Sequence, residues 1–173
     1  MQLQMNLLYL LDANVLIDAK RDYYPIHRVP QFWDWLVYMG EQSRVKVPQE
    51  VYEKVTDAQN DDLADWLKDN KEALLLLEDV DPELVNNVIE RGYANDLTDD
   101  EIEQLNEDPF LIAYALVATT QRCIVTTERS RPSRTRANRH IPDVCRDLQV
   151  RCLGTFQLID ELDFRTDWNT RIT

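Results

Sequence analysis

The chain has 173 residues, of which 44% are hydrophobic and 29% are charged, a balance typical of one soluble globular domain. The formal net charge of −13 argues against a protein that coats nucleic acid without sequence preference, because phosphate binding needs positive charge. The sequence has only three glycines and no glycine-rich phosphate-binding motif, which disfavours a P-loop or dinucleotide-binding fold.

Neither a membrane span nor a secretory signal is expected. The apolar runs are too short to cross a bilayer, and the N-terminus lacks a basic flank followed by a cleavage site. Cys123, Cys145 and Cys152 form an odd set without C-x-x-C spacing, and His27 and His140 do not complete a zinc site with them. We therefore expect a cytoplasmic protein with free thiols.

The N-terminal segment predicts a strand that is buried on both faces. An apolar run, Leu7–Leu11, leads directly into Asp12. Ligand sites of open α/β sheets form at the carboxyl ends of the strands, which is where Asp12 falls. The alternative is that Asp12 caps the helix that starts near Ala13 and is expected to end around Asp22–Pro25.

The middle of the chain alternates helical and strand patterns. The expected elements are a helix from Pro30 stopped by Gly40, a strand over Arg44–Val47, a helix with Glu50 in its first turn, and an amphipathic segment over Asp61–Leu77. Leu74–Leu77, at the end of this last segment, also fits a short edge strand, and periodicity alone leaves that choice open.

The second half continues the alternation. We expect helices from Pro82 to Gly92, from Thr98 to Leu105, from Asp108 to Ala118 and from Ile141, and a final helix capped by Thr155 that runs through Leu162. Strands are expected over Cys123–Thr127 and Val150–Leu153. The pattern predicts a three-layer α/β/α sandwich with a mostly parallel sheet of four to five strands. We assign residues 1–173 to a single domain, with a core at about 7–162 and a polar, loose tail at 163–173.

Acidic residues recur where a strand meets a helix: Asp12, Glu50, Asp108, Glu128 and Asp143. Each has an ordinary structural use, as a helix cap, a first-turn acid or, for Glu128, the partner of an arginine. In a parallel sheet, however, most of them would meet in one crevice and repel one another. Mg²⁺ or Mn²⁺ would relieve that repulsion and could activate water to attack a phosphodiester.

Four blocks of sequence resemble the PIN-domain ribonuclease family: Leu10–Asn14, Val47–Val51, Asp108–Ala115 and Ile124–Glu128. They occur in the family's order, and the resemblance covers about residues 7–162. It implies a PIN-like fold that holds one or two Mg²⁺ or Mn²⁺ ions and cleaves RNA to leave a 5′-phosphate. Many members resemble toxins silenced by an antitoxin, so we expect an antitoxin partner and a homodimer.

The positions that match the family's site are Asp12, Glu50, Asp108 and Glu128 as acids, with Asn14 and Thr126 as supports. The family usually has Asp at the fourth acidic position. Glu128 is one methylene longer, so it would reach a metal differently or through water. Asp143 is then a candidate for a further metal ligand, with a helix cap or first-turn acid as its alternative role.

An acid-free segment follows Glu128 and carries Arg129, Arg131, Arg134, Arg136 and Arg139. Arginine binds phosphate bidentately, so this arginine loop is predicted to bind RNA at the rim of the crevice; the alternative is a solvated loop. The acidic segment Asp96–Glu107 is predicted to be a solvated face.

Two other functions stay open. An aspartate-based phosphatase would use Asp12 as its nucleophile, but Asn14 stands where that chemistry usually has a second acid. A catalytically silent PIN-like scaffold would only bind RNA or a protein partner.

Overall fold

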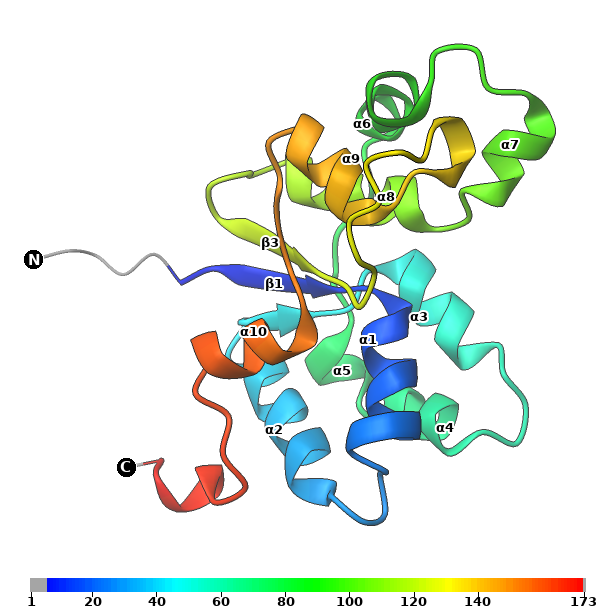
Figure 1. The fold of residues 1–173 in the computed structure, drawn as a ribbon. Coiled ribbons are helices and arrows are strands. Elements are labelled where there is room, and N and C mark those ends of the chain that lie inside the picture. Colours follow the sequence, from blue (N-terminus) through cyan, green and yellow to red (C-terminus); the bar gives the residue numbers. More distant parts are fainter. Residues whose placement is uncertain (1–5, 173) are drawn as a thin grey trace, which may run out of the picture.

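The computed structural model describes residues 6–172 and has an α/β fold built on one parallel sheet (Figure 1). The sheet has the strand order β2-β1-β3-β4, and all of its pairings are parallel. The strands are β1 (Leu8–Leu11), β2 (Val45–Lys46), β3 (Arg122–Val125) and β4 (Arg151–Leu153). Asp12 directly follows the central strand β1, and Glu128 comes three residues after the end of the other central strand, β3.

Helices connect the strands and cover the sheet. The α-helices are α1 (Ala13–Asp18), α2 (Pro30–Glu41), α3 (Gln49–Thr56), α4 (Asp62–Asp69), α5 (Lys71–Leu74), α6 (Pro82–Asn87), α7 (Asp99–Gln104), α8 (Asp108–Leu116), α9 (Ile141–Asp147) and α10 (Thr155–Glu161). Short π-helical or 3₁₀ turns are η1 (Ala19–Tyr23), η2 (Val88–Tyr93), η3 (Arg136–Asn138) and η4 (Trp168–Thr170). None of the helices within residues 6–172 has the length and apolar character to span a membrane.

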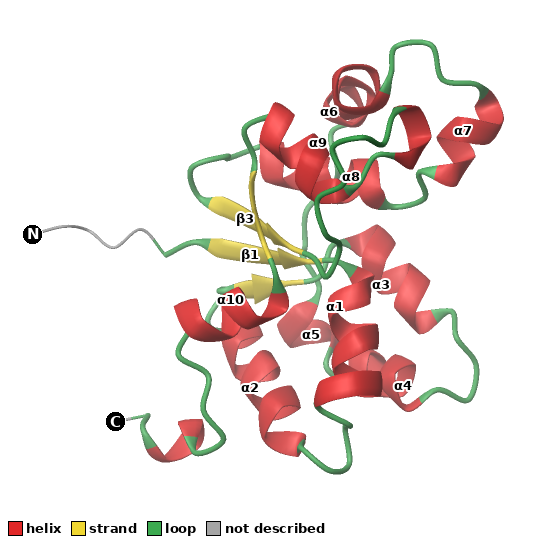
Figure 2. Ribbon diagram, viewed as in Figure 1, coloured by secondary structure: helices red, strands yellow, loops and turns green. Residues whose placement is uncertain are grey.

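The predicted three-layer α/β/α sandwich is confirmed. Figure 2 shows α6, α8 and α9 on one side of the sheet and α1, α2, α4 and α10 on the other. Alternate residues of β1 enter the two cores, since Tyr9 and Leu11 pack on the α2 side and Leu10 packs on the α8 side. Helix α8 has buried residues around its whole circumference, as its apolar sequence predicted.

The register of the two central strands brings the ends of β1 and β3 side by side. Leu11 lies opposite Val125, and the N–H of Asp12 donates to the Val125 carbonyl at 2.9 Å. The next residues, Asp12 and Thr126, therefore leave the sheet at the same edge. This is the edge at which the sequence predicted the crevice.

Gly40 does not stop α2, contrary to the sequence prediction. The helix continues through Glu41, and Ser43 takes the left-handed conformation after it, with φ 56°. A Cβ on Gly40 would lie 2.6 Å from the Ala73 carbonyl oxygen, closer than real Cβ contacts come. The glycine is needed for the close approach of α2 to α5.

The segment near Leu74 is first helical and then extended, so both of the predicted alternatives occur, one after the other. Helix α5 ends at Leu74, and Leu75 then forms a single parallel bridge with Val47. The Val47 N–H donates to the Leu74 carbonyl at 2.8 Å, and the Leu76 N–H donates to the Val47 carbonyl at 2.9 Å. This bridge places Leu75 beside Val47, just beyond the edge strand β2.

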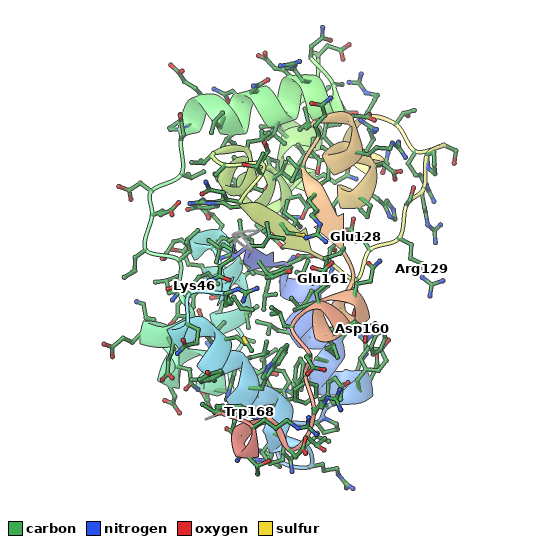
Figure 3. The ribbon with its side chains drawn as sticks, turned by 90° about the vertical axis from the view of Figure 1, so that its left-hand side faces the viewer. Lys46, Glu128, Arg129, Asp160, Glu161 and Trp168 are labelled. Atoms are coloured by element: carbon green, nitrogen blue, oxygen red, sulfur yellow. The ribbon has the colours of Figure 1, made fainter. Side chains whose placement is uncertain are left out.

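Two predictions about the C-terminal segment were wrong. Thr155 does not cap α10, because Gly154 is the cap residue and its N–H donates to the Gln157 side chain at 2.9 Å. The segment after Asp163 also packs on the domain. Phe164 lies 4.8 Å from Trp35 between ring centroids, and the Trp168 indole N–H donates to the Gln31 carbonyl at 3.0 Å, close to α2 (Figure 3).

Candidate metal centre

Asp12 is buried at the end of β1 and does not cap the helix that follows. It is 2% exposed, and its side chain makes no capping hydrogen bond to α1. Its Oδ2 instead accepts a hydrogen bond from the Thr126 hydroxyl at 2.8 Å, across the ends of the two central strands. A buried carboxylate fixed by a neighbouring strand suits a ligand site better than a helix cap.

Three carboxylates form the acidic centre of the crevice: Asp12, Glu107 and Asp108. One oxygen of each lies within 4.8 Å of one oxygen of each of the others. Glu107 is 7% exposed and immediately precedes α8, which begins at Asp108. Oxygens at this spacing can converge on a single hard cation, since Mg²⁺ and Mn²⁺ prefer carboxylate ligands.

The charges in the centre repel one another. Burial raises the pKa of Asp12 to about 6; the Thr126 hydrogen bond opposes this rise, and the charges of Glu128 and Glu107 add to it. Burial also raises the pKa of Asp108 to about 8, together with the charges of Asp12, Glu128 and Glu107. A bound divalent cation would remove this repulsion, so the donor set fits such an ion.

Sequence reasoning missed Glu107. It was assigned to the solvated acidic face, where Asp96 and Glu101 do lie, each paired with Arg136. The available signal was the acid pair Glu107–Asp108 directly before a helix that is apolar all round.

Lys54 supplies a positive charge to the acidic centre. Its ammonium contacts the Glu107 carboxylate from α3. Burial lowers the pKa of Lys54, but the hydrogen bond to Glu107 and the charges of Glu107, Asp12 and Asp108 outweigh this effect, so the pKa is raised. Lys54 is thus held as a cation beside the carboxylates.

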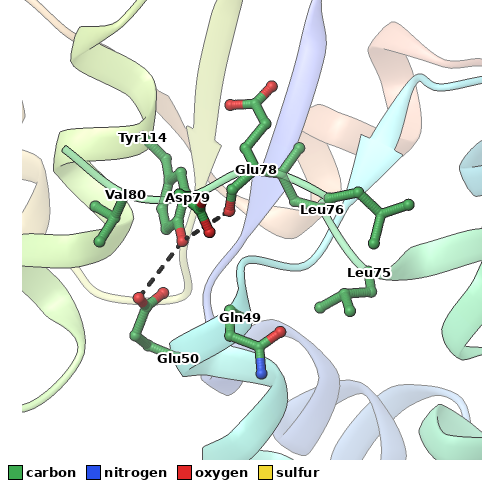
Figure 4. Close-up of a pocket in the computed structure, with 9 residues that line it drawn as sticks. Gln49, Glu50, Leu75, Leu76, Glu78, Asp79, Val80 and Tyr114 are labelled. Atoms are coloured by element: carbon green, nitrogen blue, oxygen red, sulfur yellow. Dashed lines mark hydrogen bonds between the residues drawn. The ribbon is translucent and has the colours of Figure 1, made fainter.

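The structure does not bring Glu50 into the group of three carboxylates. Its Oε1 accepts a hydrogen bond from the Tyr114 hydroxyl at 3.4 Å, and its Oε2 is buried without a partner among the described residues (Figure 4). Tyr114 and Glu50 line a cavity of about 500 Å³ together with Glu78 and Asp79. Glu50 also lines the cavity beside Lys54 and Glu107, but it is Lys54, one turn further on, that contacts the acidic centre from α3.

Glu128 lies beside the centre and has a structural partner. Its Oε2 accepts the Ile141 N–H at 2.8 Å at the start of α9, and its own N–H donates to the Thr126 hydroxyl at 3.1 Å. Its charge raises the pKa of both Asp12 and Asp108, so it lies within electrostatic range of them. The alternative, pairing with an arginine, does not occur among the described residues.

Asp143 anchors the arginine loop and does not join the carboxylate group. It is 1% exposed, accepts a hydrogen bond from the Ser130 hydroxyl, and accepts the Arg131 N–H at 2.7 Å. Burial raises the pKa of Asp143, but these two hydrogen bonds and nearby arginines lower it below its ordinary value. Its proposed role as a metal ligand is therefore replaced by a role in loop structure.

Of the two predicted supporting residues, the structure links only Thr126 to Asp12. The Asn14 side chain has no hydrogen bond to Asp12 within the part of the chain that the structure describes. The pairing of β1 with β3 explains the difference, because it sets Thr126 directly beside the carboxylate.

The five arginines of the arginine loop divide into two sets. Arg136 pairs with Asp96 and Glu101, and Arg139 pairs with Asp147. The other three side chains are exposed and form no ion pair with any residue in 6–172: Arg129, Arg131 and Arg134. Figure 3 shows Arg129 extending away from the body of the domain next to Glu128.

The chain belongs to the family described as a domain of unknown function, DUF4411, whose family model matches residues 9–166. No curated protein matches the sequence. Among solved structures, the chain is similar to the protein titled PAE2754 from Pyrobaculum aerophilum, with 18% sequence identity, 94% coverage of both chains and a TM-score of 0.46.

Proposed function

We propose that this DUF4411 protein is a Mg²⁺- or Mn²⁺-dependent endoribonuclease. The observation that carries the proposal is the acidic centre: Asp12, Glu107 and Asp108 converge at the carboxyl end of the sheet, and the pKa values of Asp12 and Asp108 are raised. These carboxylates would hold the ion. Thr126 would keep the Asp12 carboxylate in place through their hydrogen bond.

Hydrolysis at this centre needs no side-chain nucleophile. A bound Mg²⁺ or Mn²⁺ would lower the pKa of a coordinated water toward neutrality and balance the charge that develops on the phosphate. Water oxygen adds to phosphorus, the bond from phosphorus to the 3′ oxygen breaks, and that oxygen takes a proton. The products are a 5′-phosphate and a 3′-hydroxyl, as the resemblance to PIN-domain ribonucleases implies.

RNA is the proposed substrate for two reasons. The four sequence blocks resemble a family of ribonucleases, and three unpaired arginines lie in the loop that follows Glu128. Arginine side chains without an acidic partner are available to phosphate. The antitoxin partner and the homodimer rest on the resemblance and stay predictions.

The test is incubation of the purified full chain with single-stranded RNA in Mn²⁺ or in EDTA, followed by sequencing of the RNA ends. We expect new ends carrying a 5′-phosphate in Mn²⁺ and intact RNA in EDTA. Cleavage that persists in EDTA, or that leaves a 2′,3′-cyclic phosphate, would contradict the proposal, since the latter product comes from attack by the RNA's own 2′-hydroxyl.

One observation favours the silent scaffold as a second candidate. The Lys54 ammonium already compensates part of the negative charge of the acidic centre without any metal. Under that alternative, the protein would bind RNA equally in Mn²⁺ and in EDTA and leave it intact in both.

The arginine loop can be tested by replacing its three unpaired arginines together, as Arg129→Gln, Arg131→Gln and Arg134→Gln. For single-stranded RNA, each lost phosphate contact lowers the slope of log affinity against log salt concentration by about 0.7, so the slope should fall by about 2. Fluorescence anisotropy of labelled RNA over a range of salt concentrations measures this change.

The matched control removes three exposed arginines that lie elsewhere on the surface, at Arg28, Arg165 and Arg171. Net charge changes equally in both triple variants, so a general charge effect would weaken RNA binding in both. An equal loss in the two variants would show that the arginine loop has no special part in RNA binding.

A further inference from the structure

Helix α3 faces the acidic centre with a lysine. Lys54 lies one helical turn after Glu50, and its ammonium contacts Glu107, while Glu50 interacts with Tyr114. The Lys54 side chain is 45% exposed, whereas that of Glu107 is 7% exposed. The ammonium therefore lies between solvent and a buried carboxylate.

The charge of Lys54 reaches the whole centre. It lowers the pKa of Asp12 and of Asp108, against the larger opposing effects of burial and neighbouring acids. Like a bound cation, it favours the ionised form of these two carboxylates. It differs from a metal ion in being covalently attached and present at every metal concentration.

The position of the ammonium limits what else can bind. It occupies a Glu107 oxygen on the α3 side of the centre. A second divalent ion on that side would have to share this oxygen and would lie beside a fixed positive charge, and like charges repel. One divalent ion between the three carboxylates has no such conflict.

We infer that Lys54 takes the place of a second divalent ion, so that the protein binds one metal ion at the acidic centre. This inference rests on the proposed metal-dependent function and answers the question of one or two ions for this chain. In two-metal sites the second ion stabilises the leaving oxygen. Here the Lys54 ammonium supplies positive charge on the α3 side of the centre, where it can stabilise the phosphate.

The cavity next to Lys54 makes the substitution test feasible. It measures about 500 Å³ and is lined by Glu50, Glu53, Lys54, Asp57 and Glu107 among others. A glutamate at position 54 has room there and adds a carboxylate beside Glu107. The Lys54→Glu variant should therefore gain a second ion site, with two ions bound per chain.

Electron paramagnetic resonance counts the bound ions directly, because free Mn²⁺ gives a six-line signal that is lost on binding. With the full chain titrated by MnCl₂, we expect one ion for wild type, one for Lys54→Arg and two for Lys54→Glu. The matched control is Lys68→Glu, which makes the same charge change on the exposed face of α4 and should still bind one ion. Lys54→Gln serves if Lys54→Glu does not fold, with a second, weaker ion expected.

The outcomes separate this inference from the proposed function. Two ions in wild type, or one ion in both folded Lys54→Glu and Lys54→Gln, would overturn the role of Lys54 and leave metal-dependent cleavage standing. A second ion in Lys68→Glu as well would also overturn it, since a general charge effect would then suffice. No Mn²⁺ binding by wild type or by any variant would overturn both.

Discussion

Replacing Asp12 with asparagine is expected to abolish Mn²⁺-dependent RNA cleavage while leaving the fold intact. The change removes one negative charge from the acidic centre and keeps an oxygen that can accept the Thr126 hydrogen bond. Loss of a single group that stabilises charge in a transition state lowers kcat by about 10²–10³-fold, and loss of a metal ligand should reach at least that range. Cleavage assays at saturating Mn²⁺ measure the effect.

Asp143→Asn is the matched control for this prediction. Asp143 is as deeply buried as Asp12, but its carboxylate holds Ser130 and the backbone of Arg131. We expect this variant to bind Mn²⁺ like wild type and to lose RNA affinity through a disturbed arginine loop. Wild-type cleavage by Asp12→Asn, with Mn²⁺ binding retained, would disprove the assignment of the centre.

The second large effect concerns stability. In the metal-free protein, Asp108→Asn should raise the free energy of unfolding at pH 8 and flatten its dependence on pH. The folded protein holds the Asp108 proton up to a pKa of about 8, and that of Asp12 up to about 6, whereas both groups ionise near 3.8 in the unfolded chain. Between about pH 4 and pH 8 the folded state binds more protons than the unfolded state, so the free energy of unfolding falls as the pH rises through this range.

The size of this effect is on the order of 2 kcal/mol at pH 8, less than the full pKa shift would give because water reaches the centre. For a domain of this size, that corresponds to a rise of about 4–8 °C in Tm. Urea denaturation in EDTA at pH 5.5 and pH 8 measures it. Mn²⁺ should stabilise wild type at pH 8 more than Asp108→Asn. A variant less stable than wild type at pH 8 would show that the Asp108 carboxylate is not under repulsion.

The sequence predicted the layers of the fold well because the relevant signals are local. Apolar runs such as Leu8–Leu11 mark strands buried on both faces, and the capping box of Thr98 and Glu101 marks the start of α7. The order of the strands is a different matter, since it depends on packing between segments far apart in the chain.

Long-range packing also explains the misassigned residues of the fold. Gly40 was expected to end a helix, but its role is set by the Ala73 carbonyl more than thirty residues away. Phe164 and Trp168 looked like parts of a polar tail, yet their partners lie on or beside α2. A window of sequence contains only one side of each contact.

The candidate site was predicted only in part, because it too depends on packing between distant segments. Asp12 and Asp108 follow from their positions at a strand end and a helix start. Glu50 and Lys54 lie one turn apart on the same face of α3, and which of them contacts the acidic centre depends on the position of α3 along α8, which the sequence does not reveal. Glu107 required knowing that the turn before α8 points its side chain inward, at the φ of −84° and ψ of −8° it adopts.

Binding of a divalent ion by Asp12, Glu107 and Asp108 can be observed directly by anomalous diffraction at the manganese absorption edge, from crystals of the full chain soaked in MnCl₂. We expect one peak within coordination distance of the Asp12 carboxylate and of the Glu107 or Asp108 carboxylate, and no peak there in Asp12→Asn. An empty centre in wild type at millimolar Mn²⁺, with the three carboxylates still converging, would contradict it.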